Sequence, residues 1–147
     1  VMRAVAITVI PEHQINLALA LADCPDPERR DPQAAITVVR DPGLEPLYAS
    51  AGAIIETIAR VRLADWQGAH DALLRHDPKT EMLVVTPQCV HFMRALIHWQ
   101  LGRHDAAREC HARGIEAWNL VVGSDDAAWQ RSDLRRWRTA AETAMGL

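Results

Sequence analysis

Residues 98–118 have the pattern of two helices joined by a tight turn. The apolar residues Phe92, Leu96 and Trp99 lead up to the turn at steps of four and three, which is helical spacing. Gly102 ends this pattern, because glycine adopts the left-handed conformation of a helix C-terminus without steric cost. Small residues in the second helix allow it to lie close to the first: Ala106, Ala107 and Gly114. The stretch therefore predicts an antiparallel helical hairpin.

The turn of this hairpin occurs a second time, 38 residues upstream. Residues 64–69 (ADWQGA) align with residues 102–107 (GRHDAA), and Ala64 stands where the later copy has Gly102. The residues three, six and ten positions before each turn are apolar in both copies: Val61, Ile58 and Ile54, and Trp99, Leu96 and Phe92. A single hairpin cannot bury such a stripe, but stacked hairpins can, so the repeat indicates a solenoid.

Prolines and glycines divide the rest of the chain into further helices. We expect hairpins over about residues 12–41, 46–76 and 87–122, and a closing helix over about residues 126–145. Residues 2–10 are consistent with a strand or with the end of a helix, and residues 82–85 with an extended or a helical segment. The predicted fold is a single all-α domain over residues 1–147, a short right-handed solenoid of antiparallel helical hairpins.

Composition narrows the class of partner. The net charge of −3 favours neither nucleic acid nor an anionic membrane as the main partner, and no apolar run is long enough to span a membrane. Cys24, Cys89 and Cys110 are widely spaced and include no CxxC pair, so neither a disulfide framework nor a zinc site is expected. Histidines do not occur at metal-binding spacing either. We expect a cytoplasmic protein with reduced thiols, no metal and no cofactor.

Several segments resemble a known family. Residues 99–108 (WQLGRHDAAR) look like the turn of a tetratricopeptide repeat, and so do residues 63–69 (LADWQGA). Residues 21–32 (LADCPDPERRDP) are similar to a loop in tetratricopeptide modules of planctomycete-type bacterial proteins, and residues 133–142 resemble the closing helix of that arrangement. The resemblance covers residues 16–147 and implies a fold of stacked hairpins that binds other proteins. In that family such modules often follow a serine/threonine kinase domain.

The chain departs from the family at positions that matter for binding. Some members clamp the terminal carboxylate of a peptide with lysine and asparagine side chains. Here the corresponding places carry apolar residues: Ile54, Ile58, Phe92 and Leu96. Recognition of a terminal carboxylate by that route is therefore not expected.

Two sets of residues are candidates for a binding site. The apolar stripe Ile54, Ile58, Val61, Phe92, Leu96 and Trp99 either lines a groove for an apolar peptide segment or forms the core of the repeats. The polar set Glu56, Arg60, His91, Arg94 and His98 has helical spacing. It forms either a small pocket for an anion or for acid–base chemistry, or an ion pair of Glu56 with Arg94 between helices, or a solvated face.

The function we expect is that of a protein–protein interaction or scaffold module without catalysis of its own. It would bind a peptide segment or a neighbouring subunit and could assemble into a larger complex. Two alternatives stay open. One is a regulatory helical domain of a larger enzyme such as a serine/threonine kinase. The other is a small-ligand-binding or catalytic helical domain that uses Glu56, Arg94 and His98.

Overall fold

The computed structural model describes residues 11–44, 48–79, 88–122 and 128–147, and over these residues it is entirely helical. The helices follow one another as α1 (Pro11–Asp23), α2 (Pro32–Val39), α3 (Ala49–Arg62), α4 (Trp66–Leu74), α5 (Cys89–Gln100), α6 (His104–Val122) and α7 (Ala128–Met145). The predicted all-α class is therefore confirmed for this part of the chain. The expectations for residues 2–10 and 82–85, and the predicted starts of two hairpins at about residues 46 and 87, lie outside the described residues.

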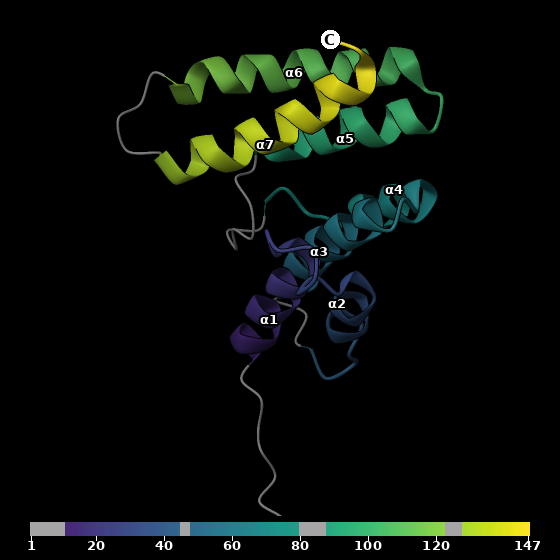
Figure 1. Ribbon diagram of the computed structural model, residues 1–147, viewed down its shortest axis with the longest axis vertical. Coiled ribbons are helices and arrows are strands. Elements are labelled where there is room, and N and C mark those ends of the chain that lie inside the picture. Colours follow the sequence, from purple (N-terminus) through teal and green to yellow (C-terminus); the bar gives the residue numbers. More distant parts are fainter. Residues whose placement is uncertain (1–10, 45–47, 80–87, 123–127) are drawn as a thin grey trace, which may run out of the picture.

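Consecutive helices pack as pairs, α1 with α2, α3 with α4 and α5 with α6. Helix α3 also contacts α1 and α2, so the first four helices form one group. Helix α5 contacts both α6 and α7 and is the centre of a second group, which lies above the first in Figure 1. The two groups meet where α4 packs on α5.

Helix ends are located by local chemistry. The Asp31 carboxylate accepts a hydrogen bond from the Ala34 amide at 3.0 Å, and Pro32 occupies the first position of α2. This arrangement is expected at a helix N-terminus. The amide at the first helical position has no acceptor within the helix, so a proline there loses no hydrogen bond. Asp65 caps α4 in the same way by accepting from the Gly68 amide. The turn between α5 and α6 has Gly102 in the left-handed region, with φ of 76°, as predicted.

One hydrophobic core extends through both groups of helices. Its largest fully buried apolar side chains come from α3, α5 and α7: Ile55, Ile58, Phe92, Met93, Ile97 and Leu134. Helices α5 and α6 approach closely at Gly114, where an added Cβ atom would lie 2.7 Å from the ring of Phe92. The ring of Phe92 therefore requires glycine at position 114. This close contact explains why the second helix of the hairpin carries a small residue here.

None of the helices among the described residues has both the length and the apolar character needed to cross a lipid bilayer.

Candidate functional site

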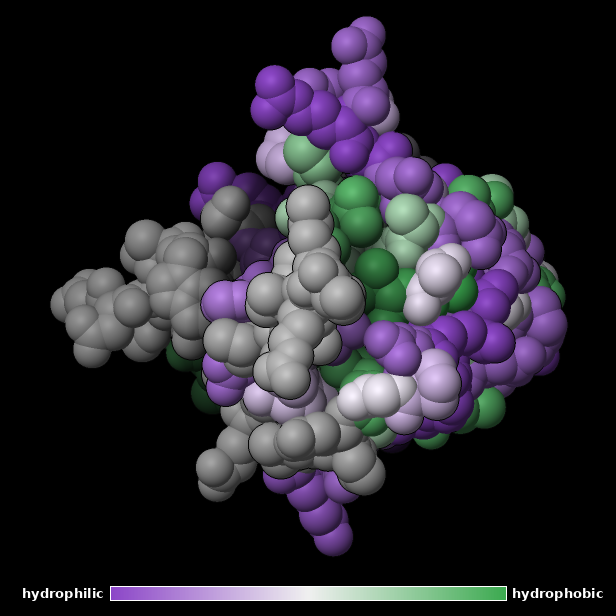
Figure 2. Space-filling model, turned by 90° about the horizontal axis from the view of Figure 1, so that it is seen from below, coloured by the Kyte–Doolittle hydropathy of each residue, from purple (hydrophilic) through white to green (hydrophobic). Residues whose placement is uncertain are grey.

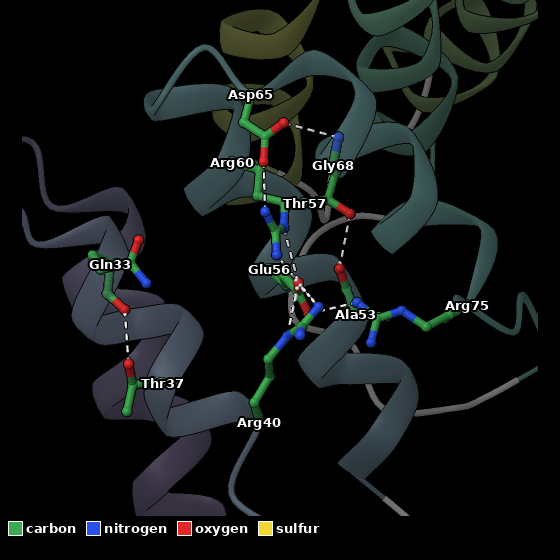
Figure 3. A network of polar contacts seen from close by, with 10 residues as sticks. All are labelled: Gln33, Thr37, Arg40, Ala53, Glu56, Thr57, Arg60, Asp65, Gly68 and Arg75. Atoms are coloured by element: carbon green, nitrogen blue, oxygen red, sulfur yellow. Dashed lines mark hydrogen bonds and ion pairs between the residues drawn. The ribbon is translucent and has the colours of Figure 1, made fainter.

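The most concentrated group of charged side chains surrounds Glu56, which lies in α3 and is only 1% exposed. Three arginines donate hydrogen bonds to its carboxylate (Figure 3). The Arg40 Nη2 and Arg60 Nε atoms lie 2.7 and 2.9 Å from Glu56 Oε1. The Arg75 Nη2 atom lies 2.5 Å from Oε2. A buried carboxylate is therefore compensated by an excess of guanidinium groups.

The surroundings of Glu56 keep it ionised. Burial by itself raises the pKa of this carboxyl group, but the hydrogen bonds from Arg40, Arg75 and Arg60 outweigh burial and lower the pKa from 4.5 to about 2. A carboxylate with so low a pKa is a poor general base near neutral pH, because a useful base has a pKa close to the working pH. The acid–base role considered for Glu56 consequently loses its chemical support.

Three different elements bring the arginines together. Arg60 lies one turn after Glu56 in α3. Arg40 and Arg75 are the C-cap residues of α2 and α4, the second helices of the first two hairpins. Glu56 therefore links three helices through a single carboxylate.

A second carboxylate, that of Asp65, holds Arg60, which is the least exposed of the three arginines. Arg60 Nη1 lies 2.5 Å from Asp65 Oδ2, while Asp65 Oδ1 accepts from the Gly68 amide at 3.0 Å. A Cβ atom on Gly68 would lie 2.2 Å from Asp65 Oδ2 and 2.7 Å from Arg60 Nη1. Any side chain at this position would displace the cap or the arginine, so the glycine is part of the network.

The outer two arginines border a hollow on the surface. The side chains of Arg40 and Arg75 are 55% and 52% exposed, whereas that of Arg60 is 21% exposed. The hollow has a volume of about 460 Å³ and is lined by residues of α2–α4 and their caps: Arg40, Glu56, Arg60, Gly68, Asp71, Ala72 and Arg75. Solvent, or a bound molecule, can thus reach the arginines from one side.

A larger recess adjoins this hollow. It has a volume of about 850 Å³ and is lined mainly by α1 and α2: Gln14, Leu17, Gln33, Ile36, Thr37, Val38, Arg40, Asp41, Pro42 and Arg60. Arg40 and Arg60 line both spaces, so the two lie next to each other at these side chains. Figure 2, which shows the molecule from below, has hydrophobic residues (green) between hydrophilic ones (purple) on this face. A recess whose wall combines apolar side chains with arginines is the combination from which a selective binding site is built.

Most of the apolar stripe predicted from the sequence lies in the core. Ile54, Ile58, Phe92 and Leu96 are at most 5% exposed. Val61 is partly buried against the same core, and Trp99 stacks on His104 with ring centroids 3.9 Å apart. In this conformation the four buried residues offer no surface to a peptide, and of the two interpretations their burial supports that of a repeat core.

The five residues of the predicted polar pocket fall into two places. Glu56 and Arg60 belong to the network described above. His91, Arg94 and His98 lie on α5, where burial lowers the pKa of both histidines. The next cause is the charge of Arg94 for His91 and the charge of His70 for His98. Among the described residues Arg94 forms no ion pair, and the pairing of Arg94 with Glu56 is not found. Helix α5 packs on α4, and the arginines that reach Glu56 come from α2, α3 and α4.

Arg40 and Arg75 were not singled out by the sequence. They lie 16 and 19 residues from Glu56, so no helical spacing connects them with it. The usable signal is that each one closes the second helix of a hairpin, just before a turn that contains aspartate and proline.

Comparisons add no family to this picture. The chain matches no protein-family model, and neither a curated protein nor a solved structure matches it. Within the described residues, no group of three or more histidine, cysteine, aspartate or glutamate side chains could hold a metal ion.

Proposed function

We propose that this chain is a non-catalytic protein-interaction module that holds a segment of a partner protein in the recess between α1 and α2. The observation that carries the proposal is that Arg40 and Arg60 line both the recess and the neighbouring hollow, which Arg75 also borders. A recess whose wall combines apolar side chains such as Leu17 and Val38 with arginines suits a peptide segment that carries both apolar and charged side chains.

The proposed architecture is a short right-handed solenoid of tetratricopeptide-like hairpins. It is supported by the pairing of consecutive helices and by the two turns at Ala64 and Gly102, which share one backbone conformation. In this arrangement the second helices of the hairpins lie beside the next hairpin, which accounts for the meeting of Arg40, from the end of α2, with Glu56 in α3. A regulatory domain of a larger enzyme would use the same recess, and that alternative stays a prediction.

Random-peptide display on phage, with the full chain as bait, tests the proposal. Thr37 is an exposed residue in the wall of the recess, so Thr37→Trp fills the space without disturbing the core. Thr139→Trp is the matched control, since Thr139 is an exposed threonine on α7. We expect selected peptides to bind the wild type and Thr139→Trp equally and to lose most of their affinity for Thr37→Trp. Equal binding to all three proteins, or no selected peptide, would show the proposal to be wrong.

A further inference from the structure

The outer arginines have hydrogen-bond donors that the protein itself does not use. Arg40 donates to Glu56 through Nε and Nη2, and Arg75 donates through Nη2. Among the described residues, no acceptor is found for Arg40 Nη1 or for Arg75 Nε and Nη1. Both guanidinium groups are about half exposed and border the same hollow. Unused donors on two neighbouring cations are what an anion from outside would bind.

The charges around the hollow limit the kind of anion. Three guanidinium groups surround Glu56, and Asp65 pairs with only one of them, Arg60. Asp71 also lines the hollow, but its carboxylate interacts with Gln67 and His70 and is 65% exposed, which weakens its effect. Three guanidinium groups against Glu56 and Asp65 leave an excess of one positive charge, which the exposed Asp71 reduces further. A single carboxylate balances it, whereas a doubly charged phosphate group would place surplus negative charge beside Glu56 and Asp71.

The apolar residues of the recess indicate which kind of side chain lies next to that carboxylate in the ligand. Leu17 is 54% exposed although it lies in the wall of the recess, and Ile36 and Val38 lie in the wall with it. An apolar side chain placed there would remove the exposed face of Leu17 from water.

This proposal rests on the proposed function and specifies its ligand. We infer that the bound segment carries an aspartate or glutamate side chain that accepts hydrogen bonds from Arg40 and Arg75, next to an apolar side chain that packs on Leu17. The partner is thus recognised by an acidic and an apolar residue together, and the complex weakens as salt is added.

The test starts from the peptides selected by phage display on the wild-type chain. We expect them to share an acidic residue near an apolar one. Replacing the acidic residue of a peptide by its amide should lower affinity about tenfold or more, because hydrogen bonds between charged groups are lost. Arg75→Gln should lower affinity for the acidic peptide to a similar degree and leave affinity for the amide peptide nearly unchanged. Arg29→Gln serves as the control, because the Arg29 side chain is 82% exposed and lines neither the hollow nor the recess.

The variants distinguish a failure of this inference from a failure of the proposed function. Arg75→Gln leaves Glu56 with two arginine partners, so the variant should fold, which circular dichroism verifies. If the selected peptides lack acidic residues and lose affinity for Leu17→Ser, the inference is wrong and the proposed function stands. If a phosphoserine in place of the acidic residue binds more tightly, the carboxylate assignment is overturned. If no peptide is selected, both proposals fail.

Discussion

Ala64 and Gly102 occupy equivalent places in two turns that are 38 residues apart, and both have a left-handed backbone, with φ of 56° and 76°. The hydrogen bonds correspond as well. The amide of Asp65 donates to the carbonyl of Arg60 at 2.9 Å, and the amide of Arg103 donates to the carbonyl of His98 at 2.8 Å. This is the closing pattern of a helix that ends in a left-handed residue. The internal repeat is therefore a repeat of backbone geometry as well as of residue type.

This equivalence predicts opposite effects of two substitutions. An alanine in the left-handed region is sterically strained by its Cβ atom, which glycine lacks. Ala64→Gly should raise the free energy of unfolding by about 0.5 kcal/mol, the steric relief being partly offset by a more flexible unfolded chain. Gly102→Ala should lower it by about 0.5–1 kcal/mol, because backbone strain outweighs the gain from a less flexible unfolded chain. No atom lies within 4 Å of the added Cβ, so no clash with a neighbour contributes. Urea denaturation at pH 7 measures both.

Ala112→Gly is the control for this pair, since Ala112 is exposed in the middle of α6. There the same chemical change should destabilise by about 1 kcal/mol. A loss of stability in Ala64→Gly as large as in Ala112→Gly would contradict the left-handed turn.

Glu56 should make stability depend on acid pH. Its pKa is lowered from 4.5 to about 2 in the folded chain, so the unfolded chain takes up the proton first as pH falls. The contribution is fully present above pH 4.5 and is lost between about pH 4.5 and 2. Its size is about 3 kcal/mol at neutral pH. Glu56→Gln should remove most of it, and its urea midpoint should change less than that of the wild type across this pH range.

The exposed Glu109, which pairs with Arg113 on the surface of α6, provides the comparison. Glu109→Gln should change stability by less than about 0.5 kcal/mol. If Glu56→Gln is equally mild at pH 7, the buried network does not exist in solution.

The contact of Gly114 with Phe92 should tolerate no added methyl group. In Gly114→Ala the gain in helix propensity of up to about 1 kcal/mol is outweighed by overpacking that costs about 1–3 kcal/mol. Gly52→Ala, also in a helix, should be neutral or stabilising, because the nearest atom to its Cβ is 3.5 Å away. Thermal unfolding of the two variants separates these effects. Adding Phe92→Leu to Gly114→Ala should recover part of the loss, and strict additivity of the two changes would argue against the contact.

Arg94→Leu should be tolerated or stabilising at pH 7. Burial lowers the pKa of His76, His91 and His98 from 6.5. The charge of Arg94 is the next cause for His76 and His91, and it adds to those of His70 and Arg103 for His98. The unfolded chain therefore binds these protons first, and stability falls as pH drops through 6.5. Removing Arg94 should make the fall between pH 7 and 5 smaller, as urea midpoints at the two pH values would reveal.

Arg135→Leu, at an exposed position of α7, removes the same charge without acting on these histidines. A marked loss of stability or of ligand binding in Arg94→Leu alone would indicate that Arg94 has a partner of its own.

Much of the helical pattern could be predicted, because the residues that end helices act locally. Asp31, Pro32 and Gly102 determine the backbone conformation at and next to their own positions, so their effects can be predicted without knowledge of the fold. The helical spacing of the apolar stripe could be predicted from the sequence, but whether the stripe is buried could not. Ile58 and Phe92 have the same period whether they face a groove or a core, and only the packing of other helices decides which.

The site was predicted in part, for a similar reason. Glu56 and Arg60 are one helical turn apart, so their pairing follows from sequence spacing. The pairing with Arg94 assumed that equivalent first helices lie side by side. In the structure α5 packs on α4, and Arg40 and Arg75 reach Glu56 from the ends of the second helices. Such meetings depend on the angles between hairpins, which residue spacing does not encode.

The sharing of one carboxylate by three guanidinium groups also sets an order in which this sequence can change. Losing Arg40 or Arg75 first leaves Glu56 with two partners and a tolerable charge balance. Losing Glu56 first leaves three like charges gathered around an uncharged position. Among descendants of this chain, arginine losses should therefore precede the loss of the glutamate, and a lineage that has kept all three arginines should have kept Glu56 too.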